Sequence, residues 1–240
     1  MKKFWEVKQS ANTKEADISI YGEIVSYKWD DTDTTAASFQ KDLKALGDIE
    51  QINLHVNSPG GAVFVRISIG NMLKKNKTTG VAQVEAFAAS IASVIVASAD
   101  KVVMPENSML MIHNPWTYSV GNAKALRKQA DDLDKIAESS VITYLSKGGD
   151  KLSEAKIKQI MDEETWLSAV EALEIGLCDE VSETVQIAAC VSKGLFQKYN
   201  NVPKEFESTT QSLNEEKARQ KMIEEAKQNN ALIGAIIGGL

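Results

Sequence analysis

The chain has 240 residues, of which 43% are hydrophobic and 25% charged, and its formal net charge is −6. These proportions are typical of a globular protein that buries a substantial core. The negative charge, with no basic stripe between aromatic residues, disfavours a nucleic-acid partner. The lysines after Met1 precede no apolar stretch, and no apolar run reaches 18 residues. We therefore expect no secretory signal, no membrane partner and a cytoplasmic location.

The chain up to His113 alternates strand patterns with helix patterns. Strands are predicted at residues 17–25, 51–56, 81–86, 101–104 and 109–113, and helices at residues 39–46, 63–74 and 90–98. Regular alternation of this kind predicts an α/β fold, in which helices pack on a parallel sheet.

The rest of the chain is mainly helical in pattern. Helices are predicted at residues 123–144, 153–161 and 168–174, and a last strand at residues 181–189. Pro203 and the polar residues after it resemble a linker, and a highly charged helix pattern follows. This change in composition predicts one domain over residues 1–200, followed by residues 201–240 as a linker and a charged helical, partly disordered tail.

Ser90 stands where a predicted strand runs into a predicted helix, among small alanine neighbours. Small neighbours let a substrate approach the backbone closely, and the amide of Ile91 would point towards a developing oxyanion. This setting is typical of a nucleophilic serine. The alternative is a small-residue helix that simply packs tightly on the sheet.

The chain contains two histidines, and His113 follows a predicted strand in the sequence Met-Ile-His-Asn-Pro. Histidine is the usual general base near neutral pH, so His113 is the candidate partner of Ser90. The acidic residues 162–164 could supply a carboxylate that orients the imidazole. The alternatives are a structural histidine and a solvated helix end, and His55, within a strand, is assigned no role.

Two glycines, Gly60 and Gly61, follow Pro59 at the end of a predicted strand. Such a loop can aim free backbone N–H groups at an anion, although a tight turn is the alternative. No nucleotide-binding glycine pattern is present, and the two cysteines, Cys178 and Cys190, lack metal-ligand spacing. We therefore expect no cofactor, no metal and buried, reduced thiols.

Four of these stretches, in this order, resemble the Clp protease proteolytic subunit (ClpP) family over about residues 17–190. They are residues 57–61, Ala88-Ala89-Ser90-Ile91, residues 111–115 and residues 166–179. The resemblance implies a ClpP/crotonase-type fold with repeated β-β-α units and a protruding helical handle. It also implies serine peptidase activity and a homo-oligomeric ring that acts on protein or peptide substrates.

The resemblance implies a role for each matching residue. Ser90 matches the family's nucleophile, His113 its base, and Gly61 and Ile91 the residues whose amides form the oxyanion hole. The family's acid is usually Asp, whereas Glu164 stands at that position here, with Asp162 as the alternative. Residues Gly60, Ala62 and Val63 match the strand edge along which substrate peptides lie.

The sequence Glu164-Thr165-Trp166 and the charged tail are similar to ClpP-like head maturation proteases of phages and prophages. This similarity predicts a protease that cleaves scaffold and capsid proteins. The alternatives are a housekeeping ClpP that works with a Clp ATPase, and a non-enzymatic capsid-assembly or scaffold protein with a degenerate triad. A crotonase-like acyl-CoA enzyme would not need Ser90 beside a positioned His113. Related signal peptide peptidases pair Ser with Lys, and the presence of His113 disfavours them.

Overall fold

The computed structural model describes residues 3–9, 14–25, 36–61, 78–184, 199 and 201–203. The chain divides into two units, residues 1–188 and 189–240, and all helices and strands described below lie in the first. The helix expected at residues 63–74 and the tail from residue 204 lie outside the described residues. The domain boundary at residue 200 and the tail therefore stay predictions.

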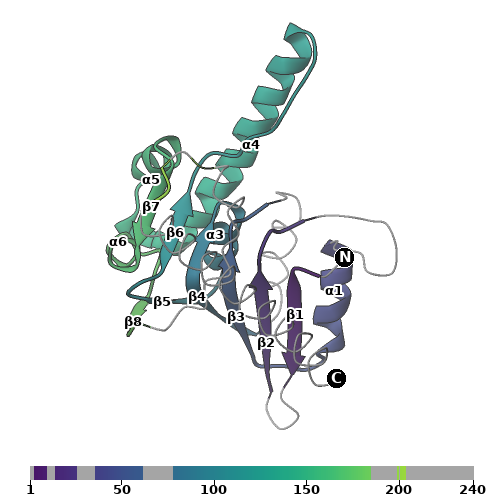
Figure 1. Cartoon of the computed structure of the whole chain (residues 1–240), viewed down its shortest axis with the longest axis vertical. Coiled ribbons are helices and arrows are strands. Elements are labelled where there is room, and N and C mark those ends of the chain that lie inside the picture. The colour runs from purple at the N-terminus through teal and green to yellow at the C-terminus, as the bar shows by residue number, and fades with distance from the viewer. Residues whose placement is uncertain are drawn as a thin grey trace, which may run out of the picture. The chain divides into compact units, whose positions relative to one another are not determined.

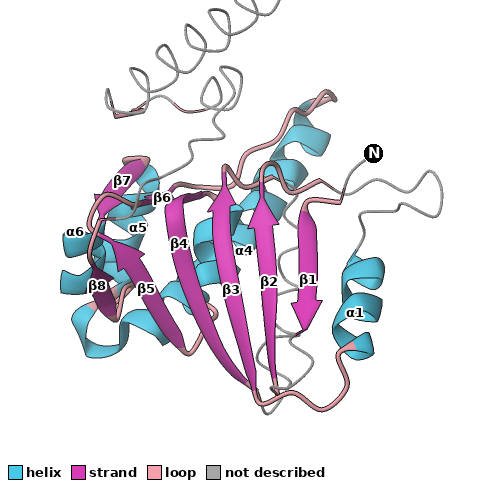
Figure 2. Ribbon diagram, turned by 60° about the horizontal axis from the view of Figure 1, so that its bottom comes forward, coloured by secondary structure: helices cyan, strands magenta, loops and turns pink. Residues whose placement is uncertain are grey.

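The described part of the chain is built on one mixed sheet of eight strands (Figure 2). The strands are β1 (Trp5–Gln9), β2 (Glu15–Tyr21), β3 (Gln51–Ser58), β4 (Thr79–Ala89), β5 (Lys101–Pro105), β6 (Met109–Ile112), β7 (Thr165–Ser168) and β8 (Glu180–Ser182). Their order is β1-β2-β3-β4-β5-β8, while β6 pairs with β4 and β7 pairs with β6. The predicted α/β class is confirmed, and the repeated β-β-α units stay a prediction.

Most neighbouring strands are parallel, as predicted, but two pairs are antiparallel, β1 with β2 and β6 with β7. Two short strands were not predicted from the sequence: β1, at one edge of the sheet, and β7, at the end of the branch through β6. The strand expected at residues 181–189 is β8, which ends at Ser182. Residues 185–189 of the expected strand lie outside the described residues.

The long strand β4 has two different neighbours along one side. Its residues 81–83 pair with β5, whereas its residues 87–89 pair with β6. The chain that leaves the end of β4 therefore emerges beside the end of β6. This branching of the sheet brings residues 90 and 113 to the same place.

The helices lie against this sheet. They are α1 (Ala36–Ala45), α3 (Ile91–Val96), α4 (Ala123–Gly148), α5 (Glu154–Asp162) and α6 (Ala169–Glu174), with a 3₁₀ turn at Gly149–Lys151. The buried residues of α4 all lie in its C-terminal part, from Ser140 to Gly148. Its first turns accordingly project from the body of the first unit (Figure 1). The predicted long helix is confirmed, with its end at Gly148.

Alternation along the central strands separates the core from a polar face. In β3, Ile52, Leu54 and Val56 are at most 1% exposed, while the residues between them are half-buried and mostly polar. His55 belongs to this polar face, where its Nδ1 lies 3.1 Å from Glu85 Oε1. Every residue of α3 is buried, so this short helix forms the centre of the core beside the sheet.

Two further features concern the described residues alone. No helix among them combines the length and the apolar character needed to cross a membrane. Nor does any group of three or more His, Cys, Asp or Glu side chains in those parts of the chain have an arrangement that could hold a metal ion. Cys178 is a buried free thiol, and Cys190 lies outside the described residues.

Candidate active site

Ser90 forms a strained turn between β4 and α3. Its backbone has φ 57° and ψ −123°, a combination that residues with a side chain rarely adopt. The Ser90 N–H donates to Met111 O over 2.8 Å, which fastens the turn to β6. Such a turn exposes the Oγ at the end of the sheet while the buried helix α3 follows directly, which is the geometry of a nucleophile elbow.

His113 lies against this turn because of the pairing between β4 and β6. Ala89 is opposite Met111 in the parallel register, so the residues that follow these two strands leave the sheet side by side. The Ser90 Oγ and the His113 Nε2 are 2.7 Å apart, a hydrogen-bond distance. The structure thus brings together the two residues that the sequence analysis paired.

Burial lowers the pKa of His113 below its usual 6.5, and the negative charge of Glu164 opposes this shift without cancelling it. The imidazole is therefore mostly neutral at neutral pH. A neutral imidazole that accepts the Ser90 hydroxyl proton at Nε2 carries its own proton on Nδ1. In that form His113 can take a proton from Ser90, as a general base must.

Glu164 lies across from His113 because of the antiparallel pairing of β6 and β7. The last pair in this register is Ile112 with Thr165, and extending the register by one residue places Glu164 opposite His113. Glu164 has φ 50°, and its N–H donates to Met161 O over 3.3 Å. Its charge acts on the imidazole, as the pKa of His113 shows.

Asp162, the alternative acid, has a different partner. Its Oδ1 accepts a hydrogen bond of 2.7 Å from Asn114 Nδ2. Asp162 is the last residue of α5, and this contact ties that helix to the segment that follows His113. Asn114 had no predicted role, and its hydrogen bond with Asp162 joins residues 48 positions apart that no local sequence pattern connects.

The glycine loop packs directly on the Ser90 turn. A Cβ on Gly60 would lie 2.8 Å from the Ser90 Cβ and 3.1 Å from the Ile91 N, so only glycine fits there. Gly60 has φ 84°, and its carbonyl accepts a hydrogen bond of 2.8 Å from the Ile24 N–H. Gly61 forms a bridge with Ile24, and a Cβ on Gly61 would meet the Ile24 carbonyl oxygen at 2.0 Å.

The loop therefore packs so closely on the Ser90 turn that no Cβ fits between Gly60 and the Ile91 N. The other two substrate-binding candidates, Ala62 and Val63, lie outside the described residues.

A recess of about 490 Å³ begins beside the segment that follows His113. It lies between α4 and α5, and its lining residues are Asn114, Pro115, Ala130, Leu133, Asp134, Ala137, Glu138, Val141, Lys158, Met161 and Asp162. The floor is apolar and the rim carries charged groups. A recess of this kind can receive a side chain of a bound peptide.

Residues 7–185 match the family model described as Clp protease. The chain is 34% identical over 130 residues to ATP-dependent Clp protease proteolytic subunit 1 of Protochlamydia amoebophila (strain UWE25), covering 52% of this chain and 62% of that protein. It is 31% identical over 143 residues to the ATP-dependent Clp protease proteolytic subunit of Chlorella vulgaris, covering 58% and 70% of the two chains. The chain thus spans less than two thirds of the first relative.

Proposed function

Because the chain belongs to the Clp protease family, we propose that it is a serine endopeptidase in which Ser90 and His113 act together on a peptide bond. The observation that carries this proposal is the hydrogen bond of 2.7 Å between Ser90 Oγ and His113 Nε2, at a strained turn in front of a helix. A packing role alone gives no reason for a strained serine to face a largely neutral imidazole.

The chemistry follows from the positions of the side chains. His113 takes the hydroxyl proton as the Ser90 Oγ attacks a peptide carbonyl, and then gives it to the leaving amine. Water hydrolyses the resulting acyl-enzyme with the same base. The amides of Gly61 and Ile91 stabilise the negative oxygen of each tetrahedral intermediate.

Glu164 is the proposed third member of the triad, holding the imidazole proton on Nδ1. The extended register of β6 and β7 and the effect of the Glu164 charge on the pKa of His113 both favour it over Asp162. Asp162 instead holds Asn114 and so shapes the recess. In this proposal Gly60, Ala62 and Val63 border the bound peptide.

A fluorophosphonate probe tests the proposed activity, because it reacts with an activated serine and with few other groups. We expect the folded full-length protein to be labelled on Ser90, as located by mass spectrometry of the digested product. Ser90→Ala should not be labelled. Ser98→Ala is the matched control, since Ser98 donates to Val94 O just beyond the same helix and should leave labelling unchanged.

Absence of labelling in a folded, assembled wild-type sample would contradict the proposal. It would favour the alternative in which the chain is a non-enzymatic assembly or scaffold protein. Size measurement belongs in the same experiment, because the proposal includes a homo-oligomeric ring and the assembled form is the one to label.

The physiological substrate separates two versions of this proposal. Both relatives are named as subunits of ATP-dependent proteases, which favours degradation of proteins together with a Clp ATPase. Processing of scaffold or capsid proteins rests on Glu164-Thr165-Trp166 and on the charged tail. Cleavage of a folded protein only in the presence of a Clp ATPase would support the first version. Portal and capsid genes beside the coding gene would support the second.

A further inference from the structure

A chain of buried hydrogen bonds ends on the carbonyl oxygen of Ser90. Ser93 Oγ lies 2.6 Å from Ser90 O, and Tyr144 OH lies 2.8 Å from Ser93 Oγ. Ser93 is fully buried and Tyr144 is 2% exposed, so water does not compete for either contact. Ser93 belongs to α3 and Tyr144 to α4, so the contact links a second helix to the Ser90 turn.

The direction of these hydrogen bonds follows from the number of protons. A carbonyl oxygen can only accept a hydrogen bond, so the hydroxyl of Ser93 donates its one proton to Ser90 O. Ser93 Oγ is then an acceptor towards Tyr144, and the phenol is the donor. The chain runs one way, from Tyr144 through Ser93 to Ser90. Each donor polarises the next, so the tyrosine strengthens the contact that the serine makes.

The carbonyl of Ser90 and the amide of Ile91 belong to one planar peptide unit. In a trans unit the C=O and the N–H point in opposite directions, so fixing the oxygen also fixes the direction of the Ile91 N–H. That N–H is one of the two oxyanion donors in the proposed function. A donor that rocks away from the oxyanion stabilises it less.

The Ser90 turn needs such restraint, because its φ of 57° and ψ of −123° are unfavourable for a residue with a side chain. On one side, the Ser90 N–H is held by Met111 O. On the other side, Ser90 O accepts from the Ser93 N–H at 3.1 Å and, more closely, from the Ser93 hydroxyl at 2.6 Å. The shorter contact is the one that α4 supports through Tyr144.

We propose that Ser93 and Tyr144 are positioning residues, which hold the Ser90–Ile91 peptide so that the Ile91 amide faces the oxyanion. This inference rests on the proposed function, and neither residue touches the substrate. The two residues help to stabilise the transition state, in which the negative oxygen forms, and do not strengthen the binding of the peptide.

Ser93→Ala is the first test, made in the full-length protein with a fluorogenic peptide substrate. We expect kcat to fall about 10- to 100-fold, less than the loss caused by removing an oxyanion donor outright, while KM changes little. A peptide aldehyde, whose carbon bonds to the Ser90 Oγ and whose own oxygen then becomes negative, should bind more weakly by the same factor as kcat. Binding of the uncleaved peptide should be unchanged.

Ser108→Ala is the matched control for the loss of a buried serine. Ser108 is also fully buried and its Oγ also donates to a backbone carbonyl, Pro105 O, over 2.8 Å. We expect the two variants to lose similar stability in thermal unfolding. Only Ser93→Ala should lose kcat and aldehyde affinity.

Tyr144→Phe removes the phenol oxygen and keeps the ring, and we expect it to lower kcat about three- to tenfold, the effect of one ordinary hydrogen bond. Because Tyr144 acts through Ser93, the variant with both changes should be no slower than Ser93→Ala alone. If the two single losses of kcat multiply in the double variant, Tyr144 does not act through Ser93, and this part of the proposal is wrong.

The outcomes separate this inference from the proposed function. If the wild type is labelled on Ser90 and Ser93→Ala has wild-type kcat and aldehyde affinity, the positioning role is wrong and the protease assignment stands. If the wild type neither reacts with the fluorophosphonate nor hydrolyses peptides, the proposed function fails and the inference fails with it.

Discussion

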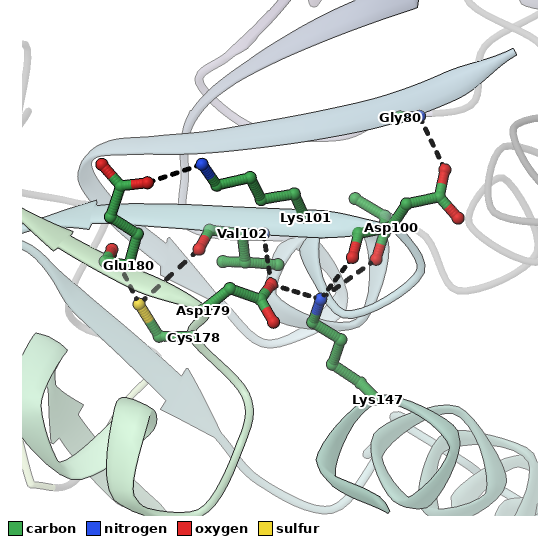
Figure 3. Close-up of polar contacts among 9 residues, drawn as sticks. Gly80, Asp100, Lys101, Val102, Lys147, Cys178, Asp179 and Glu180 are labelled. Atoms are coloured by element: carbon green, nitrogen blue, oxygen red, sulfur yellow. Dashed lines mark hydrogen bonds and ion pairs between the residues drawn. The ribbon is translucent and has the colours of Figure 1, made fainter.

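Two polar contacts that join helix α4 to the rest of the first unit lie three residues apart and differ in chemistry. At Tyr144 the contact is a chain of neutral hydroxyl groups that ends at the Ser90 carbonyl. At Lys147 it is an ammonium group with a carboxylate and two backbone carbonyls, shown in Figure 3. The same helix thus contacts the Ser90 turn through Tyr144 and Ser93, and contacts the residues just before β5 and β8 through Lys147.

The charged contact is fully satisfied. Lys147 Nζ has three protons and three acceptors, Asp179 Oδ2 at 2.5 Å, Asp100 O at 3.0 Å and Ala99 O at 3.3 Å. Asp179 Oδ2 also accepts a hydrogen bond of 2.6 Å from the Val102 N–H. The network ties α4 to β5 and to the residue that precedes β8 (Figure 3).

The two contacts of α4 therefore have different consequences for stability and for activity. A satisfied ion pair holds helices and strands together but transmits nothing to Ser90, because no member of it contacts the Ser90 turn in the described residues. The neutral chain ends on the peptide that carries the proposed oxyanion donor. Substitutions at the two points should therefore separate stability from activity.

The largest effect on activity should come from His113→Ala. Without the base the Ser90 hydroxyl stays protonated, and we expect kcat to fall at least about 1,000-fold. The imidazole is only half-buried, so thermal unfolding should change far less than activity. Steady-state hydrolysis of a peptide checks this, and retention of a tenth of the wild-type kcat would contradict the role of His113.

Glu164→Gln should have the next largest effect. The amide keeps the size of the side chain but loses the charge that holds the imidazole proton on Nδ1, and we expect kcat to fall about 100- to 10,000-fold. Asp162→Asn is the matched control, since its oxygen can still accept from Asn114. A larger loss of kcat for Asp162→Asn than for Glu164→Gln would transfer the third role to Asp162.

The sequence predicted the central elements well, because burial alternates along β3 and β4 and because glycines end α1 and α4. It missed β7, whose four residues follow an acidic turn and show no alternation long enough to detect. The register of that strand, extended by one residue, puts Glu164 opposite His113, so the observation that favours Glu164 over Asp162 was not accessible from the sequence. The partnership of Ser93 and Tyr144 was also inaccessible, since it joins residues 51 positions apart through packing alone.

Lys147→Met should have the largest effect on stability among these substitutions. The side chain is 6% exposed, and its loss leaves two carbonyls and the Asp179 carboxylate without their cation. Because Asp179 is partly exposed, we expect the free energy of unfolding to fall by about 2–3 kcal/mol, below the cost of breaking a fully buried pair. Chemical denaturation measures this change.

The matched control is Lys158→Met, which removes an exposed ion pair with Glu154 and should change stability little. At temperatures where Lys147→Met is folded, its kcat should equal that of the wild type. A loss of kcat in the folded Lys147→Met protein, comparable with that of Tyr144→Phe, would show that the two contacts of α4 are not separate.

The smallest effect is a shift in pH dependence. Protonated His113 cannot act as a base, so kcat/KM should fall as the pH drops through its pKa, which burial places below 6.5. The unfolded state binds the proton more readily, so this group also lowers stability as the pH falls from 6.5 towards the folded pKa, and no further below it. This fall in kcat/KM at low pH is the acid limb of the pH profile, and it is measured by peptide hydrolysis.

Glu164→Gln should move that limb to still lower pH. The charge of Glu164 raises the pKa of His113 and partly offsets the effect of burial, so removing the charge leaves burial unopposed. Asp162→Asn should leave the limb nearer its wild-type position, because the carboxylate of Asp162 is not among the groups that shift His113. An unchanged limb in Glu164→Gln, or a shift to higher pH, would contradict the conclusion that the charge of Glu164 raises the pKa of His113.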